Sequence, residues 1–239
     1  MSSETTNNKL LVIAFPSVGL VGAFATSYLV NQLQMKDIGE LEFAKISPTY
    51  VIHNGEIYGP IRIYNKDNLY AILASIPLNS ISTYDLIVKA IEFAKNNGIR
   101  KIIIPRGLEA GENYKNEPTS HGLAVNKQSK SLLDEYHLPL VTGATVLGAD
   151  ASVISALKNS EIPGIILYTT CRKMFPDDDA IITSIKTLAD IIKVKIDTEK
   201  FEERLESINK ENEKLIEETK RSIGNSSQMH SSNPPPGVG

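Results

Sequence analysis

Two segments of this sequence carry residues that could bind an anion or transfer a proton, and each follows an apolar run. The first is Phe15-Pro16-Ser17-Val18-Gly19-Leu20-Val21-Gly22. Glycines between a strand and a helix let backbone N–H groups approach an anion at the helix N-terminus. The spacing fits neither the dinucleotide fingerprint nor a P-loop, and no Gly-Lys-Ser/Thr follows. The alternative interpretation is structural: Gly19 and Gly22 allow a helix to pack closely on a sheet.

The second segment is Pro105-Arg106-Gly107-Leu108-Glu109, expected just past the end of a buried strand. Arg106 could hold a phosphate or carboxylate, and Glu109 could act as a base. The alternative is an Arg106–Glu109 ion pair that orders the loop after it. Ligands of open parallel sheets bind at the carboxyl ends of the strands. One possible ligand pocket therefore combines Gly19, Gly22, Arg106, Gly107 and Glu109.

The remaining candidates for chemistry are isolated. No two of the four histidines stand at metal-ligand spacing, and His121 is the best placed for acid–base work, with a loop histidine without chemistry as the alternative. Ser17 lacks the flanking glycines of a nucleophile elbow. Asp177-Asp178-Asp179 could bind a divalent cation or supply the negative charge that a helix N-terminus favours. We expect no complete catalytic set, no metal site and no cofactor.

Composition narrows the class of protein. The chain has 239 residues, 41% hydrophobic and 22% charged, with a net charge of −3 and no Trp. This balance disfavours a nucleic-acid binder, which usually has a basic face. Cys171 is the only cysteine, which excludes an internal disulfide and a Cys-based zinc site. Residues 1–8 lack the order of a signal peptide, and no apolar run approaches the roughly 18 residues of a membrane span. We expect a cytoplasmic protein without membrane contact.

The elements that must position these residues alternate between buried strands and amphipathic helices, which predicts a mostly parallel sheet with helices on both faces. Turn signals such as Asn54-Gly55 divide 42–76 into antiparallel strands or hairpins. Gly98 is expected as a helix C-cap and Asp150 as an N-cap. A polar loop is expected over 109–120. The expected strands are 10–15, 101–105, 140–147 and 164–170, and the expected helices are 18–33, 83–97, 128–136, 150–159 and 177–192.

The character of the chain changes after Asp197. Residues 198–223 contain 14 charged residues in 26, with Phe201, Leu205, Ile208 and Leu215 on a four-three spacing. Such a narrow stripe predicts a helix that either lies along its own domain or pairs with another helix as a short coiled coil. Residues 224–239 have no Asp, Glu, Lys or Arg and are expected to be disordered, like residues 1–8. The α/β domain is expected to span 9–197.

The order of several segments carries a resemblance to a known family. Ala14–Gly22 is followed by Gly-Ile-Arg-Lys-Ile-Ile-Ile at 98–104 and by Leu147-Gly148-Ala149-Asp150-Ala151-Ser152. Ile162-Pro163-Gly164-Ile165, then Pro176 and a helix, then Ile196-Asp197-Thr198 lead into the charged terminal helix. This arrangement, over residues 9–222, resembles the proteasome-assembly-chaperone family in its archaeal or bacterial form.

The resemblance implies a nucleoside-phosphorylase-like three-layer α/β/α sandwich with a mostly parallel mixed sheet and a C-terminal helix. It also implies a homo-oligomer that binds proteasome α-subunits. Some members end in a hydrophobic–Tyr–any tripeptide that docks on the α-ring, whereas the last tyrosine here is Tyr168 and the sequence ends Gly237-Val238-Gly239. Contact is therefore expected from the folded body or from the stripe of Phe201, Leu205, Ile208 and Leu215.

These observations favour a binding protein over an enzyme. The alternative is an enzyme of phosphorylase or nucleosidase type that binds a nucleotide or another phosphate ligand, because the implied fold is shared with such enzymes and fold does not fix function.

Overall fold

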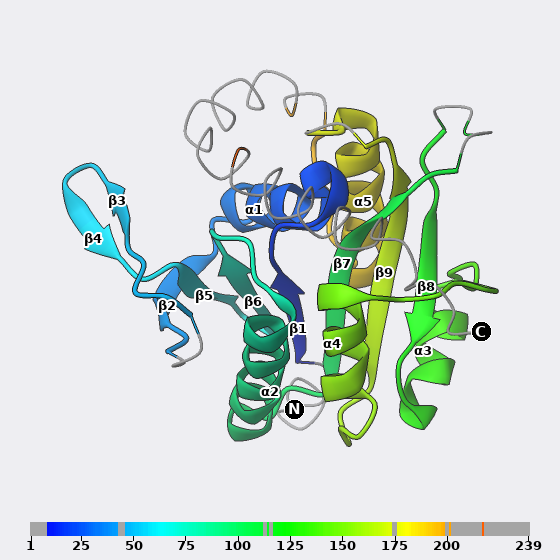
Figure 1. Ribbon diagram of the computed structural model, residues 1–239, viewed down its shortest axis with the longest axis horizontal. Helices are drawn as coiled ribbons and strands as arrows, with labels where there is room; N and C mark the ends of the chain where they lie inside the picture. Colours follow the sequence, from blue (N-terminus) through cyan, green and yellow to red (C-terminus); the bar gives the residue numbers. More distant parts are fainter. Residues whose placement is uncertain are drawn as a thin grey trace, which may run out of the picture.

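The computed structural model describes residues 9–42, 46–111, 114, 117–173, 176–198, 201 and 217. Its core is a seven-stranded sheet with helices on both faces (Figure 1). The strands are β1 (Leu10–Ala14), β2 (Lys36–Glu40), β3 (Val51–His53), β4 (Glu56–Tyr58), β5 (Ile61–Lys66), β6 (Leu69–Ala74), β7 (Lys101–Glu109), β8 (Ser120–Ala124) and β9 (Gly164–Cys171). The helices are α1 (Val21–Gln32), α2 (Ser80–Asn96), α3 (Lys130–Glu135), α4 (Gly148–Leu157) and α5 (Asp178–Ile192).

The strand order is β2-β5-β6-β1-β7-β9-β8. β1 pairs in parallel with β6 and β7, and β7 pairs in parallel with β9. β2 is antiparallel to β5, which is antiparallel to β6, so β2, β6, β1, β7 and β9 all point the same way. The predicted α/β/α sandwich with a mostly parallel mixed sheet is therefore confirmed.

The middle of the sheet is apolar on both faces. All five residues of β1 are buried, as are 102–107 of β7 and 164–169 of β9. Alternate residues of these strands pack into two hydrophobic clusters, one beneath α1 and α5 and the other beneath α2 and α4. This double burial explains why the strands appear in the sequence as continuous apolar runs.

The segment between α1 and α2 is antiparallel, as predicted. β5 and β6 form a hairpin at one side of the sheet. β3 and β4 form a separate two-stranded sheet that projects from the body (Figure 1). Asn54 and Gly55 connect them with φ angles of 50° and 82°. Two positive φ angles define the type I′ hairpin turn that an Asn-Gly pair favours.

The helix ends follow local side-chain chemistry. The Asn79 side chain accepts a hydrogen bond from the Ser82 N–H and starts α2 three residues earlier than expected. Gly98 has a φ of 67°, which confirms its predicted place after the helix. Asp177 is the N-cap of α5 and accepts from the Ala180 N–H, while Asp178 and Asp179 lie in the first turn. The acidic run therefore serves the helix N-terminus, as its second interpretation predicted.

β7 is four residues longer than predicted. Residues 105–109 continue the strand and pair with 167–171 of β9, so Arg106 and Gly107 lie within a strand and not in a loop. Pro105 is tolerated because β1 pairs with β7 only as far as Ile103, which leaves one side of β7 without a partner strand.

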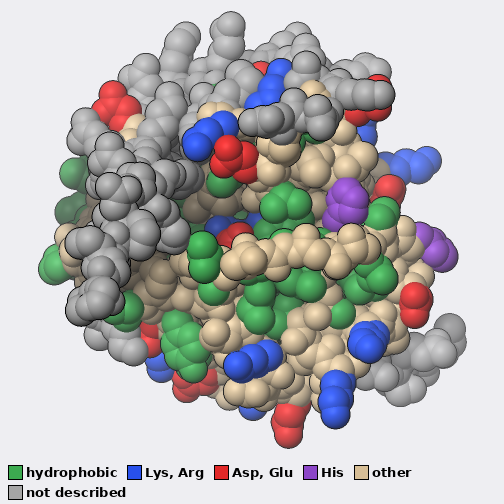
Figure 2. Space-filling view, turned by 45° about the vertical axis from the view of Figure 1, so that its right-hand side comes forward, with side chains coloured by type: hydrophobic (Ala, Val, Ile, Leu, Met, Phe, Trp, Pro, Cys, Tyr) green, Lys and Arg blue, Asp and Glu red, His purple; other side chains and the backbone are tan. Residues whose placement is uncertain are grey.

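The predicted strand over 140–147 is wrong. Its one ladder contact in the described chain is a bridge between Gly122 and Leu140, and 141–147 have no regular structure. The strand at this edge is β8, which begins at Ser120, where the predicted polar loop ends. α4 begins at Gly148 with Leu147 as its N-cap, so Asp150 lies in the first turn and is not the cap. Figure 2 brings this side forward and shows hydrophobic side chains gathered across the middle of the face.

Two further observations concern the chain as a whole. Among the described residues, no helix is long and apolar enough to cross a membrane. The predictions of disordered residues 1–8, a helix over 198–223 and a disordered tail over 224–239 fall outside the described residues, apart from 198, 201 and 217.

Candidate functional site

The glycine turn packs tightly against the sheet. A Cβ on Gly22 would overlap the backbone carbonyl of Pro105, and one on Gly107 would overlap the carbonyl oxygen of Val18. Gly19 has a φ of 64° and lies next to the Cys171 side chain. These contacts support the structural interpretation of Gly19 and Gly22, because the space that an anion would need is filled by protein.

Arg106 points to the opposite face of the sheet. Its side chain is buried, and its guanidinium lies over the Phe15 ring at 4.2 Å from the centroid. Nε donates to Asp150 Oδ1 at 2.7 Å, Nη2 lies 2.5 Å from the same oxygen, and Nη1 donates to the Phe15 carbonyl at 3.3 Å. The partner of Arg106 is thus Asp150, 44 residues away in the sequence, and not Glu109 as predicted.

Arg106 belongs to a row of polar side chains across three strands. Tyr168 is opposite Arg106 on β9, and His121 is opposite Tyr168 on β8, so the three side chains share one face. The Tyr168 hydroxyl donates to Asp150 Oδ2 at 3.3 Å. Burial, reinforced by the negative charge of Asp150, raises the pKa of Tyr168 above its usual value. The hydroxyl therefore stays protonated and keeps its role as a donor.

Arg106, Asp150 and Tyr168 form a closed network. Each of the three guanidinium nitrogens lies within reach of a protein oxygen, so Asp150 and the Phe15 carbonyl hold Arg106 in place. The network holds the first turn of α4 against the carboxyl-terminal half of β7. His121 Nδ1 is buried without a hydrogen-bond partner among the described residues.

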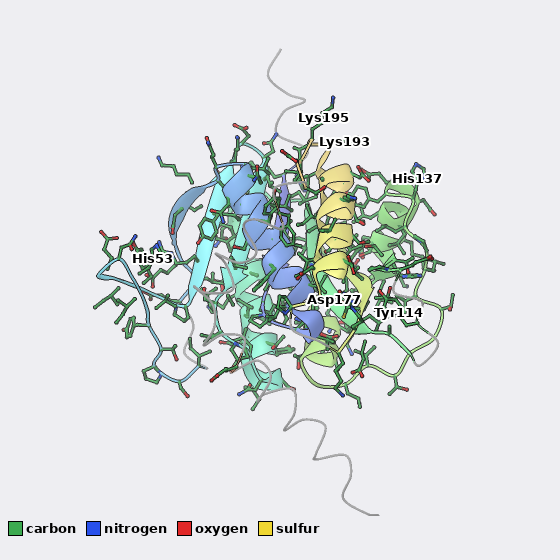
Figure 3. The ribbon with its side chains drawn as sticks, turned by 90° about the horizontal axis from the view of Figure 1, so that it is seen from above. His53, Tyr114, His137, Asp177, Lys193 and Lys195 are labelled. Atoms are coloured by element: carbon green, nitrogen blue, oxygen red, sulfur yellow. The ribbon has the colours of Figure 1, made fainter. Side chains whose placement is uncertain are left out.

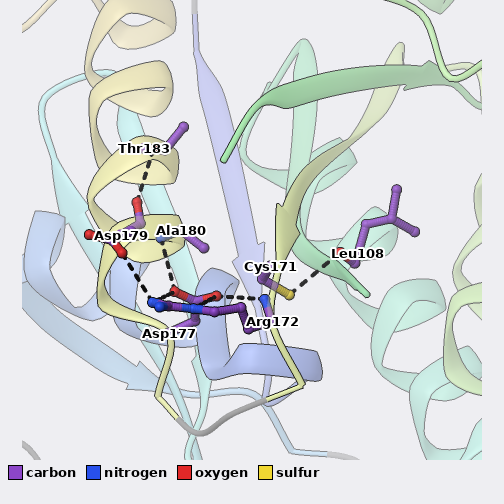
Figure 4. Close-up of polar contacts among 7 residues, drawn as sticks. All are labelled: Leu108, Cys171, Arg172, Asp177, Asp179, Ala180 and Thr183. Atoms are coloured by element: carbon purple, nitrogen blue, oxygen red, sulfur yellow. Dashed lines mark hydrogen bonds and ion pairs between the residues drawn. The ribbon is translucent and has the colours of Figure 1, made fainter. Parts of the chain in front are cut away.

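A second charged cluster lies on the other face, where α5 begins. Figure 3 shows Asp177 at this end of α5 and Lys193 at the other. The fully buried Asp177 carboxylate accepts from the Arg172 backbone N–H at 2.6 Å and from its guanidinium at 2.7 Å. Arg172 also donates to Asp179 at 3.0 Å (Figure 4). The cluster joins the end of β9 to the N-terminus of α5.

Cys171 lies beside this cluster and is fully buried. Its Sγ is 3.6 Å from the Leu108 carbonyl oxygen (Figure 4). Burial, with smaller contributions from Asp177 and Glu109, raises the pKa of the Cys171 thiol from 9.0 to about 12. Because the thiolate is the nucleophile, this cysteine is unreactive at neutral pH.

The five residues of the predicted pocket do not meet. Gly19, Gly22 and Gly107 lie on the α1 and α5 face, whereas Arg106 lies on the α2 and α4 face. Glu109 is half exposed at the end of β7 and lies 3.6 Å from Lys173 Nζ. Sequence reasoning found Arg106 but missed its partners Asp150 and Tyr168. The one available hint was a tyrosine and an arginine in otherwise apolar strands, where buried polar groups need partners.

The predicted contact stripe is only partly described. The Phe201 side chain is fully buried and packs edge-on against Tyr28 of α1, with ring centroids 5.0 Å apart. Phe201 therefore contacts its own domain. Leu205, Ile208 and Leu215 lie outside the described residues, so their contact with a partner stays a prediction.

The fold and the site define a three-layer α/β/α protein whose buried charges are paired with each other. The chain belongs to the PAC2 family, whose model matches residues 11–216. The resemblance inferred from the order of segments is thus confirmed.

Solved structures share the fold. PbaA of Pyrococcus furiosus, described as an archaeal homolog of proteasome-assembly chaperone, matches with a TM-score of 0.77 at 20% identity, over 92% of this chain and 97% of that one. A protein of unknown function from Thermoplasma acidophilum matches with a TM-score of 0.75 at 22% identity, over 93% and 91%. PbaB of Pyrococcus furiosus, described as an archaeal proteasome activator, matches with a TM-score of 0.65 at 17% identity, over 90% and 96%.

A curated relative from Methanocaldococcus jannaschii, the uncharacterized protein MJ0106, is 26% identical over 108 residues. The match spans 45% of each of the two chains.

Proposed function

We propose that this chain is a cytoplasmic binding protein that assists proteasome assembly by contacting proteasome α-subunits as a homo-oligomer. The observation that carries the proposal is the family match over residues 11–216 together with the likeness to PbaA over almost the whole of both chains. The cytoplasmic location rests on the single cysteine, which fits a reducing compartment.

The geometry supports binding through surfaces. Backbone packing leaves no space at the glycine turn, and Asp150 pairs with Arg106. The residues that were candidates for ligand binding therefore stabilise the domain. Large hydrophobic side chains are exposed at several places in the described structure. Ile38 lies on β2, and Tyr50, Ile52 and Ile57 lie on or next to the projecting hairpin. Ile81, Tyr84 and Val88 lie on α2, and Leu140 and Leu147 lie at the two ends of 140–147. Exposed apolar groups of this kind mark sites of protein–protein contact.

The test is native mass spectrometry of the full chain mixed with recombinant proteasome α-subunits at micromolar concentration. We expect a complex containing both proteins. A variant ending at Ile223 is the matched control and should bind equally, because residues 224–239 contain no tyrosine and no Asp, Glu, Lys or Arg. If no complex forms at these concentrations, the proposed partner is wrong.

The enzyme alternative has less support, because its five residues are divided between the two faces of the sheet. A thermal-shift screen of the full chain against nucleotides and nucleosides tests it. The binding proposal predicts a flat screen. A melting point that rises with one nucleotide, in proportion to the logarithm of its concentration, would favour the enzyme.

A further inference from the structure

A cavity of about 380 Å³ lies at the end of the sheet where the parallel strands begin. Leu10, Leu69 and Lys101, the first residues of β1, β6 and β7, line it together with the ends of α1, α3 and α5. Its volume falls in the lower part of the range of small-molecule sites, about 300–1,000 Å³. The glycine turn follows the other end of β1, so this cavity is separate from the pocket predicted from the sequence.

The apolar part of the cavity wall is mainly aliphatic. Its aliphatic side chains are Leu10, Leu33, Leu69, Ile191, Ile192 and Val194. Of the described residues that line the cavity, Tyr136 alone is aromatic. Such a wall matches a hydrocarbon chain better than a nucleobase, which gains most from stacking on aromatic rings. The nucleotide screen described above is therefore still expected to be flat.

The charged groups of the cavity are three lysines and two carboxylates, so the lining has a net positive charge. Lys101 Nζ donates to both carboxylate oxygens of Glu135, at 2.7 and 2.9 Å. Lys66 Nζ donates to the Leu33 carbonyl at the end of α1, at 2.7 Å, and keeps two further N–H groups. Asp67 is exposed on the turn between β5 and β6.

Lys193 is the third lysine, and its ammonium group makes no hydrogen bond or ion pair with another described residue. It ends α5 with φ 58° and ψ 44°, a left-handed conformation in which glycine is favoured. A lysine that is kept in a strained position points to a use for its side chain. One use is the favourable position of a positive charge at a helix C-terminus. The other is an anion bound in the cavity.

We propose that this cavity binds a small aliphatic ligand with one anionic head group, of the fatty-acid class. The hydrocarbon chain lies against the aliphatic wall, and the carboxylate accepts hydrogen bonds from Lys193 and Lys66. A carboxylate matches the single excess positive charge of the lining, whereas a phosphate monoester carries a charge of about −2. The site lies within one chain and does not depend on binding to α-subunits.

Calorimetric titration of the full chain with decanoate, below its micellar concentration, tests the proposal. We expect saturable binding and a melting temperature that rises with the logarithm of the decanoate concentration. Decanol lacks the charge and acetate lacks the chain, so each should bind more weakly. Lys193→Gly should weaken decanoate binding by about tenfold or more, the loss of one charged hydrogen bond. The free variant should melt no lower than wild type, because glycine relieves the left-handed backbone.

Two matched controls separate the ligand from the helix end. Gln34→Gly relieves a similar backbone at the end of α1, where φ is 51°, but Gln34 does not line the cavity. Lys195→Ala removes a nearby lysine that is also outside the lining (Figure 3). Both should bind decanoate like wild type. No binding of decanoate, equal binding of decanol, or Lys193→Gly with the wild-type affinity would each overturn the proposal. Tighter binding of decyl phosphate than of decanoate would overturn the assignment to a carboxylate.

Discussion

Gly22 lies against the backbone of β7, where α1 crosses the sheet. A Cβ at this position would overlap the Pro105 carbonyl, which is fixed by the strand and cannot move like the end of a flexible side chain. We expect Gly22→Ala to lower the free energy of unfolding by about 3 kcal/mol, the upper range for overpacking. Urea unfolding measures this. Gly143→Ala is the control, since nothing lies within 4 Å of its added Cβ. Equal stability of the two variants would show that Gly22 is not constrained by packing.

A second prediction at the residue scale concerns the Cys171 thiol and the pH dependence of stability. Its pKa rises from 9.0 to about 12 because the thiol is buried, so the folded chain keeps the proton at a pH where the unfolded chain releases it. This contribution to stability is complete below pH 9 and is lost as the pH rises towards 12. Above pH 9 we expect wild type to lose about 1.4 kcal/mol per pH unit more than Cys171→Ala does. Urea unfolding of both proteins at pH 8 and pH 10 measures the difference, and parallel losses would contradict the raised pKa.

Arg106 shows how far residue types alone can locate a site. An arginine after an apolar run predicted a ligand site or an ion pair with Glu109, whereas the structure places Arg106 in a buried network with Asp150. The partner could not be found in the same way, because Asp150 is brought in by the packing of α4 on the sheet. Its local context, at the start of a helix, equally fits an N-cap. Long-range pairing of charges depends on topology, which a local pattern does not contain.

At the scale of elements, β1 and β9 were predictable because burial on both faces produces a continuous apolar run. The end of β7 was not, since proline and glycine at 105 and 107 usually stop a strand. The Gly107 N–H points away from β9 and donates to Ser17 Oγ at 3.3 Å. Pro105 has the same parity, so the hydrogen bond that proline lacks is not needed there.

β8 is the edge strand of the sheet, although the sequence predicted a strand at 140–147 instead, and the cause is related. Residues 120–124, Ser-His-Gly-Leu-Ala, have weak strand propensity, yet they pair with β9 along their whole length. Residues 140–147 have stronger propensity but meet β8 only at the Gly122–Leu140 bridge, where the Val141 N–H donates to the Gly122 carbonyl. Pairing partners outweigh intrinsic preference in a sheet.

This difference can be measured by hydrogen exchange. The amides of 142–147 make no backbone hydrogen bond in the described structure, whereas those of β9 pair with β7 and β8. We expect 142–147 to exchange within seconds and 165–169 to be protected by at least about a thousandfold, because strands of the core open only with large free energies. Mass spectrometry of peptic peptides reports both. Strong protection of 142–147 would show that this segment is paired in solution.

At the scale of the whole molecule, the chain that follows α5 contacts α1 through Asp197 and Phe201. The Tyr28 hydroxyl donates to the Asp197 carbonyl at 2.5 Å, and the Phe201 ring packs on Tyr28 at an interplanar angle of 86°. These contacts fasten Asp197 and Phe201 to α1. Of the two interpretations of the terminal stripe, Phe201 follows the one in which it lies along its own domain. The same stripe can still offer its later positions to another chain.

Phe201 and the later positions of the stripe should therefore behave differently. Phe201→Ala opens a cavity against Tyr28 and should lower the free energy of unfolding by about 3–5 kcal/mol, with the oligomeric mass unchanged in native buffer. Tyr50→Ala, at a 70% exposed position, is the control and should change stability little. Truncation after Asp197 removes both the anchor and the rest of the stripe. If Phe201→Ala kept the wild-type stability but formed a smaller oligomer, Phe201 would act between chains and not within one. If the truncated chain lost mass while Phe201→Ala did not, the oligomer would depend on residues beyond the anchor.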